Sequence, residues 1–172
     1  MNQITSSVIP STLPGAAAKH LFQFHQQELD ALFDSLSCPA DAQLQGLFRG
    51  TLFGISGINA LPRWLRSPIY RLLASFINPW KGKSFADGEG ANSWFNSKGS
   101  VSFGYYFTGS GDDEQGKPLL RLNYLHPRTP GLLQPIRGEA RLLADGVWLA
   151  RMRWQGKNNL TTLLYFTLEP AA

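Results

Sequence analysis

The sequence has little of what marks several large classes of protein. Its 172 residues hold one cysteine, Cys38, so no disulfide can form within the chain and nothing indicates an oxidising compartment. No stretch approaches the ~18 consecutive apolar residues of a membrane-spanning helix. Residues 1–15 have no basic cluster and are interrupted by Pro10 and Pro14, so they do not read as a secretory signal. We expect a flexible N-terminal arm over 1–15, one domain over 16–172 and a soluble, cytoplasmic protein.

Charge runs, metal motifs and cofactor motifs are also missing. The net charge is +4, but the sixteen basic residues are scattered, so the sequence does not predict nucleic-acid binding. His20 and His25 are five apart and do not share a helical face, and the acidic loop 109–116 lacks the spacing of a calcium loop. No phosphate loop or dinucleotide fingerprint occurs. We therefore expect neither a metal nor a cofactor.

Two segments have helical periodicity. Residues 16–36 repeat apolar side chains at three- and four-residue spacing and predict an amphipathic helix that ends before Pro39. Residues 61–77 predict one or two short helices broken by Pro68, which we expect to act as a lid near the mouth of a barrel. Contact with an anionic membrane surface is a less favoured alternative for this segment. Its predicted apolar face consists of Leu65, Ile69, Leu72, Leu73 and Phe76, and Arg63, Arg66 and Arg71 occupy the rest.

Most of the remaining chain alternates between apolar and polar residues, as β-strands do. A glycine-rich first strand over 44–54 is followed by strand candidates at 81–85, 93–96, 100–108, 119–125, 135–144, 147–154 and 160–169. Antiparallel strands in such number hide their edges by closing. The fold class is therefore mainly β with helices (α+β), an antiparallel β-barrel of about eight strands that can enclose one small ligand.

The dipeptide Asp145-Gly146 is the strongest turn signal and predicts a two-residue hairpin. In that register Leu143 faces Trp148, Arg141 faces Ala150 and Glu139 faces Met152. A wall that combines Trp and Met with one Glu and one Arg is typical of a ligand cavity, in which Arg141 would orient an acidic group. The alternative is that Glu139 and Arg141 pair in solvent.

Three further strands are expected to turn alternate side chains inward. Phe103 and Tyr105 share one face of their strand with Val101 and Phe107, and Tyr124 shares a face with Leu120 and Leu122. A third inward face consists of Leu160, Leu164, Phe166 and Leu168. The predicted ligand-binding residues are Arg141, Glu139, Trp148, Met152, Phe103, Tyr105 and Tyr124.

The order of elements resembles lipocalin-like and fatty-acid-binding-protein-like barrels. The opening Gly46-Leu-Phe-Arg-Gly50 is similar to the first strand of lipocalins, although Phe48 stands where they carry tryptophan. The segments 135–141, 145–150 and 163–169 look like uncharacterised bacterial barrel proteins. This resemblance implies binding of a small hydrophobic or amphipathic molecule, with the ligand and the oligomeric state left open.

Two other functions fit the same sequence. A small barrel enzyme would use Glu139 or His126 as its acid or base. An interaction module would instead fill the barrel with its own side chains.

Overall fold

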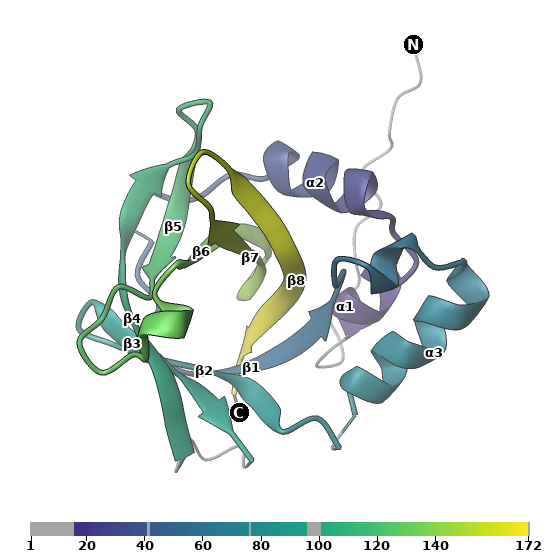
Figure 1. Ribbon diagram of the computed structural model, residues 1–172, viewed down its shortest axis with the longest axis horizontal. Coiled ribbons are helices and arrows are strands. Elements are labelled where there is room, and N and C mark those ends of the chain that lie inside the picture. Colours follow the sequence, from purple (N-terminus) through teal and green to yellow (C-terminus); the bar gives the residue numbers. More distant parts are fainter. Residues whose placement is uncertain (1–15, 41, 76, 96–100, 172) are drawn as a thin grey trace.

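A closed barrel of eight antiparallel strands forms the body of the protein (Figure 1). The computed structural model describes residues 16–40, 42–75, 77–95 and 101–171, so the predicted arm 1–15 lies outside the described residues, as do Phe76, Asn96 and Ser100. Each strand pairs with its successor, and β8 pairs with β1. The predicted fold class is confirmed. The strands are β1 Gly46–Phe53, β2 Trp80–Ala86, β3 Glu89–Trp94, β4 Val101–Asp112, β5 Pro118–Asn123, β6 Ile136–Ala144, β7 Val147–Gln155 and β8 Leu160–Pro170.

The predicted helix 16–36 is two helices, α1 (Ala16–Leu21) and α2 (Gln26–Ser35). The chain is extended at His25, whose backbone N–H donates to the Glu28 carboxylate over 2.6 Å. Glu28 is the third residue of α2, so this hydrogen bond is part of a capping box, which marks the start of a new helix. The spacing of apolar residues over 16–36 continues across the break between α1 and α2, so the sequence pattern did not predict two helices.

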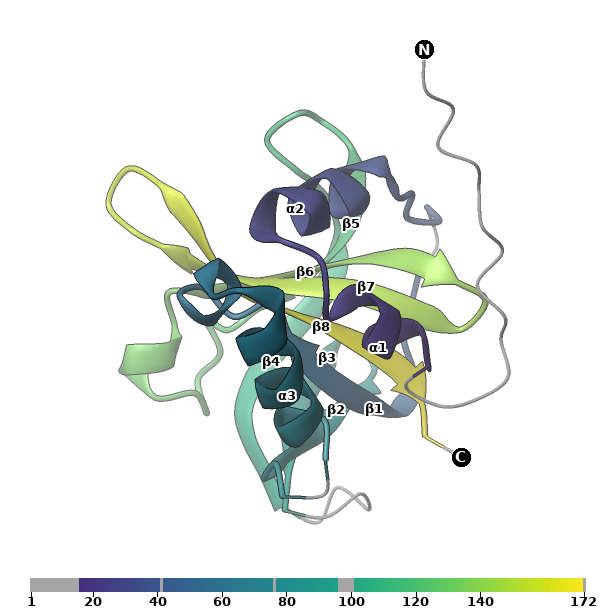
Figure 2. The ribbon, with the colours of Figure 1, turned by 90° about the vertical axis from the view of Figure 1, so that its right-hand side faces the viewer.

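The third helix, α3 (Arg63–Leu73), follows the short 3-10 turn η1 (Ile58–Ala60). It contacts β1 and lies beside the barrel wall, outside the ring of strands (Figures 1 and 2). The predicted helix is present, but it packs against the outside of the wall and does not cover an end of the barrel as the expected lid would. A second 3-10 turn, η2 (Gly131–Leu133), lies between β5 and β6. No helix of the described residues is long and apolar enough to cross a membrane.

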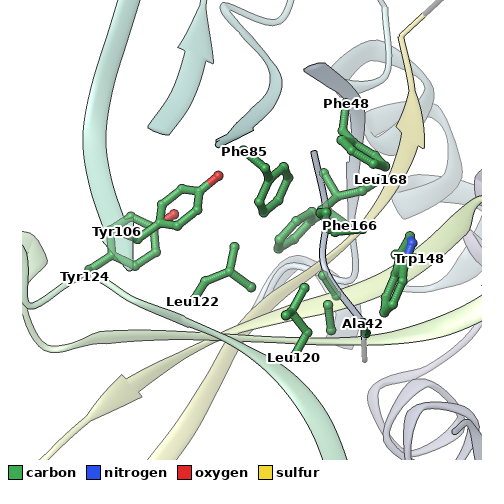
Figure 3. Packing of buried hydrophobic residues seen from close by; sticks show 13 residues of the cluster. Ala42, Phe48, Phe85, Tyr106, Leu120, Leu122, Tyr124, Trp148, Phe166 and Leu168 are labelled. Carbon is green, nitrogen blue, oxygen red and sulfur yellow. The ribbon is translucent and has the colours of Figure 1, made fainter. Parts of the chain in front are cut away.

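Apolar side chains pack on both sides of the barrel wall. The inner cluster includes Phe48, Phe85, Tyr106, Leu120, Leu122, Tyr124, Ala140, Trp148, Ala150, Phe166 and Leu168 (Figure 3). The outer cluster joins α1, α2 and α3 to β1, β7 and β8 through Leu21, Phe22, Leu29, Phe33, Phe53, Tyr70, Leu149 and Tyr165. The inward faces predicted for β5 and β8 are confirmed at Leu120, Leu122, Tyr124, Leu164, Phe166 and Leu168.

One end of the barrel is covered by the chain between α2 and β1. Ser37 forms a bridge to Leu142, and Ala42 and Leu44 are buried in the inner cluster. Cys38 packs against the same cluster. The described residues at this end also border a pocket of about 390 Å³ that reaches Leu120. The opposite end, which we call the mouth, includes the start of β2, the end of β3 and the start of β4.

Candidate functional site inside the barrel

The hairpin of β6 and β7 differs from the predicted register by one residue. Leu142 pairs with Trp148 and Ala144 pairs with Val147, so Leu143 is an extra residue, a β-bulge. Glu139 consequently pairs with Arg151, and Gly138 takes the place opposite Met152. Because a shift of one residue exchanges the two faces of a strand, Trp148 and Met152 remain on the inner side while Glu139 and Arg141 lie on the outer side.

Arg141 is buried between the barrel and α2. Its guanidinium donates to an Asp113 carboxylate oxygen over 2.7 Å and to the Phe33 carbonyl over 3.1 Å, and it also contacts the carbonyls of Pro118 and Lys117. Asp113 belongs to the acidic loop 109–116, and its side chain is almost fully buried. These contacts hold α2 and the β4–β5 hairpin to the wall.

Glu139 has a similar structural environment on the outer side. Its two oxygens accept from Arg151 over 2.7 Å and from Arg153 over 3.3 Å. The second acid-base candidate, His126, lies between the rings of Tyr105 and Phe107, with Nε2 3.5 Å from Glu89. The two side chains have separate partners on separate strands. No group of three potential metal ligands occurs among the described residues.

A charged side chain that does lie inside the barrel is Lys83 on β2. A register shift between Trp80 and Gly82 makes Lys81 the extra residue of a second bulge, so Trp80 and Lys83 both reach the interior. Gly82 has φ +145°, and a Cβ there would overlap the carbonyl oxygen of Phe48. Only glycine combines this conformation with that close approach. The bulge therefore depends on Gly82, and it places the lysine.

The amino group of Lys83 has an amide, a phenol and aromatic rings around it. Its side chain is 1% exposed, and Nζ donates to Asn92 Oδ1 and to the Tyr124 hydroxyl, each over 2.6 Å. Asn92 Oδ1 also accepts from Trp80 Nε1 over 3.2 Å, and Asn92 Nδ2 donates to Tyr124 over 3.1 Å. The ring centroids of Tyr106, Tyr124, Phe166 and Trp80 are 4.6 to 6.0 Å from Nζ.

Lys83 has no ion pair with any carboxylate of the described residues, unlike Arg141 and Arg151 of the outer face. Burial lowers the pKa of its amine from 10.5 to about 7. A buried ammonium is stabilised here by cation–π contacts and neutral oxygens only. A strongly perturbed titratable group in a barrel interior is a candidate for a functional site.

A third bulge decides which residues of β4 face inward. Ala91 pairs with Tyr105 and Asn92 with Phe103, which leaves Gly104 as the extra residue, at φ +74°. Tyr106 therefore points into the barrel (Figure 3), and Tyr105 stacks on the outside with Arg128, 3.8 Å from its ring centroid. Phe103 shares the inner face with its partner Asn92 but is 47% exposed.

The predicted site residues are thus divided between three places. Trp148, Met152 and Tyr124 belong to the inner cluster or pack against it, and Phe103 lies at the rim. Arg141, Glu139 and Tyr105 lie outside, so the predicted mixed wall does not form. Sequence reasoning missed Lys83, Asn92 and Trp80, for which the available signal was Lys81-Gly82-Lys83, a glycine inside a strand between two polar residues.

Comparison with known proteins gives one informative match. No protein-family model matches the chain, and no curated protein matches it. A crystal structure of a protein from Thermomonospora curvata superposes with a TM-score of 0.58 at 19% identity, covering 92% of this chain and 94% of that one. The likeness shows the fold alone. It carries no residue role to this chain.

Proposed function

We propose that the barrel binds a small amphipathic molecule with an anionic head group, a carboxylate in the simplest case, at Lys83. The observation that carries this proposal is a fully buried amine with no acidic partner among the described residues. The apolar part of the ligand would pack among inner side chains such as Tyr106, Leu122 and Phe166. Lys83 would therefore bind the head group in place of Arg141, the residue that the sequence predicted for this role.

The energetics favour a ligand that supplies negative charge. Burial of an uncompensated charge destabilises a fold by several kcal/mol, by order of magnitude. A carboxylate beside Nζ would offset that penalty and form a charge-assisted hydrogen bond. Tyr124 and Asn92 would position the head group, because their polar atoms already converge on the same nitrogen.

The mouth of the barrel lies close to this group. Phe103 faces inward directly opposite Asn92, yet about half of its surface is accessible to solvent. Trp80, which bonds Asn92, is also only partly buried. An anionic head group entering past Phe103 would therefore meet Asn92 and Lys83 first, with its chain in contact with the aromatic side chains.

The test compares dodecanoate with dodecanol, which have the same chain and differ in charge. Calorimetric titration at pH 6.5 should give tighter binding of the acid by about 10- to 100-fold, the range of a charge-assisted hydrogen bond of about 1.5–3 kcal/mol. Lys83→Met should remove this preference, and Lys157→Met, at an exposed turn residue, should retain it. Equal binding of acid and alcohol by the wild type, or binding of neither, would refute the proposal.

The pH dependence of dodecanoate affinity is a second test of the same proposal. The anion binds the protonated amine, so affinity should fall about tenfold per pH unit above the free-protein pKa of about 7, until the pKa of the complex is reached. Dodecanol should show no such slope. A flat acid profile between pH 6 and 9 would show that Lys83 does not bind the head group.

The low pKa of the amine favours a second candidate function, covalent capture of an aldehyde. The neutral Lys83 nitrogen would attack the carbonyl carbon, and loss of water would give an imine, with the adjacent Tyr124 hydroxyl placed to move the proton. Incubation with dodecanal and cyanoborohydride should then add one alkyl group to Lys83 in the peptide map. Random labelling of surface lysines would refute this second function and leave the first intact.

A further inference from the structure

Helix α3 has its polarity inverted relative to an ordinary surface helix. The fully buried side chains are Arg66 and Tyr70, whereas sequence periodicity predicted Arg66 on the outer face. The Arg66 guanidinium donates to the Asn59 carbonyl over 2.9 Å, to His25 Nδ1 over 2.8 Å and to the Gln23 carbonyl. These oxygens and the ring nitrogen hold the two terminal nitrogens of the guanidinium, whereas its Nε has no hydrogen-bond partner among the described residues. With Arg66 and Tyr70 turned inward, Trp64, Leu65 and Leu72 of α3 face solvent.

The solvent side of α3 and the residues after it carry large apolar side chains. Trp64 is 73% exposed, Leu72 56% and Ile77 63%, with Leu65 also exposed. We refer to these four residues as the α3 apolar surface. Phe95 continues it toward the barrel mouth, since its N–H bonds the carbonyl of Pro79 over 2.6 Å. Several large apolar side chains exposed along one helix and the residues after it are typical of an interaction site.

The charged residues of the segment that carries the α3 apolar surface are of one sign. Arg63 and Arg71 are exposed on the helix, and the sequence contains no Asp or Glu between Asp41 and Asp87. A two-fold contact between copies would bring these arginines near their equivalents, because such a contact uses the same patch twice. The complementary partner is therefore both anionic and able to accept Trp and Leu side chains.

We propose that α3 docks on an anionic phospholipid surface, with Trp64 and Leu72 inserted at the interface and Arg63 and Arg71 on the lipid phosphates. Tryptophan prefers the membrane interface, and a basic helix with an apolar face lies in its plane. Arginines near an anionic leaflet add to the attraction. The docking is independent of the ligand proposed for Lys83, although it would bring the barrel mouth near a lipid source.

The test uses flotation of the full chain with vesicles of phosphatidylcholine alone and with 30% phosphatidylserine. Binding should require phosphatidylserine and weaken as salt is raised. Arg63→Glu/Arg71→Glu should weaken binding at least about 30-fold, since each arginine near an anionic surface contributes a factor of about five to the affinity. Trp64→Ala/Leu72→Ser should abolish it. Leu132→Ser and Lys157→Glu are the matched controls, exposed residues of other segments, and should bind as the wild type does.

All of these residues are exposed, so the variants should keep the wild-type circular dichroism spectrum and melting temperature. Equal binding to both vesicles, no binding to either, or unchanged binding by Trp64→Ala/Leu72→Ser would overturn the proposal. Sedimentation velocity distinguishes the other occupant. A dimer that dissociates in Trp64→Ala/Leu72→Ser would identify the α3 apolar surface as a contact between copies and would also overturn the docking on lipid.

Discussion

Substitution Lys83→Met tests the central feature of the barrel without any ligand. Methionine has a similar length and shape and cannot be charged, so it fills the same space. Lys83 titrates at about 7 in the folded protein against 10.5 in the unfolded chain. Below pH 7 both states hold the proton, and the folded state bears the whole penalty. Between pH 7 and 10.5 the unfolded chain holds more protons, so raising the pH favours folding, by about 5 kcal/mol in total as an upper bound.

The expected result is a difference in slope. The unfolding free energy of the wild type should rise relative to Lys83→Met by roughly 1.4 kcal/mol per pH unit between pH 7 and 9.5. Lys83→Met should also be the more stable protein at pH 6. Urea unfolding followed by far-ultraviolet circular dichroism measures both quantities.

Two choices make the comparison clean. Burial raises the pKa of Tyr106, Tyr124 and Tyr165, whose contribution to stability is lost only above about pH 10, outside the range compared. Lys157→Met, at an exposed position, should follow the wild-type slope. Parallel curves for wild type and Lys83→Met from pH 6 to 9.5 would show that the amine is not buried as described, and the argument for a head-group site would fail with it.

Two further predictions concern the wall. Burial raises the pKa of Asp113, but hydrogen bonds from the Lys117 and Gln115 backbone and from Arg141 lower it further, to about 2. The stability that the ionised Asp113 contributes is therefore present above about pH 4 and lost as the pH falls through 2. Asp113→Asn should lower the unfolding free energy by about 3 kcal/mol at pH 7 in urea unfolding, and the difference from the wild type should become smaller in acid. Gly82→Ala should cost about 3 kcal/mol or more in the same assay because of its φ and the Phe48 carbonyl, whereas Gly109→Ala, with open space around it, should stay within about 1 kcal/mol.

The order of strands and the turns between them could be predicted from the sequence. Alternation of apolar and polar residues predicted eight strands in the observed order, and Asp145-Gly146 forms the β6–β7 turn where it was expected. Two bounds differ most: β3 begins at Glu89 where the prediction began at 93, and β4 continues to Asp112 where the prediction ended at 108. Strand existence depends on local side-chain pattern and turn chemistry, which a sequence displays directly. The shift in β6 was not visible, because both alternating sets between Glu139 and Ala144 contain apolar residues.

Bulges explain why the site could not be predicted as the strands were. An extra residue at Leu143, Lys81 or Gly104 exchanges the two faces of its strand, and the sequence around each allows either phase. Lys83 and Tyr106 therefore lie inside the barrel, and Glu139 and Tyr105 lie outside it. The inverted face of α3 depends on contacts between segments distant in sequence, such as that of Arg66 with His25, which the periodicity of α3 does not show.

The charges of the wall separate structural roles from a functional one. Arg141 and Arg151 are as deeply placed as many active-site residues, but each has a carboxylate within 2.7 Å, and Phe33 lies against both guanidiniums. Breaking such a pair destabilises the fold, so these arginines are explained by the attachment of α2. Lys83 has only an amide, a phenol and rings. Methionine there would give a more stable fold, and the ligand that we propose would bring the opposite charge that Lys83 lacks.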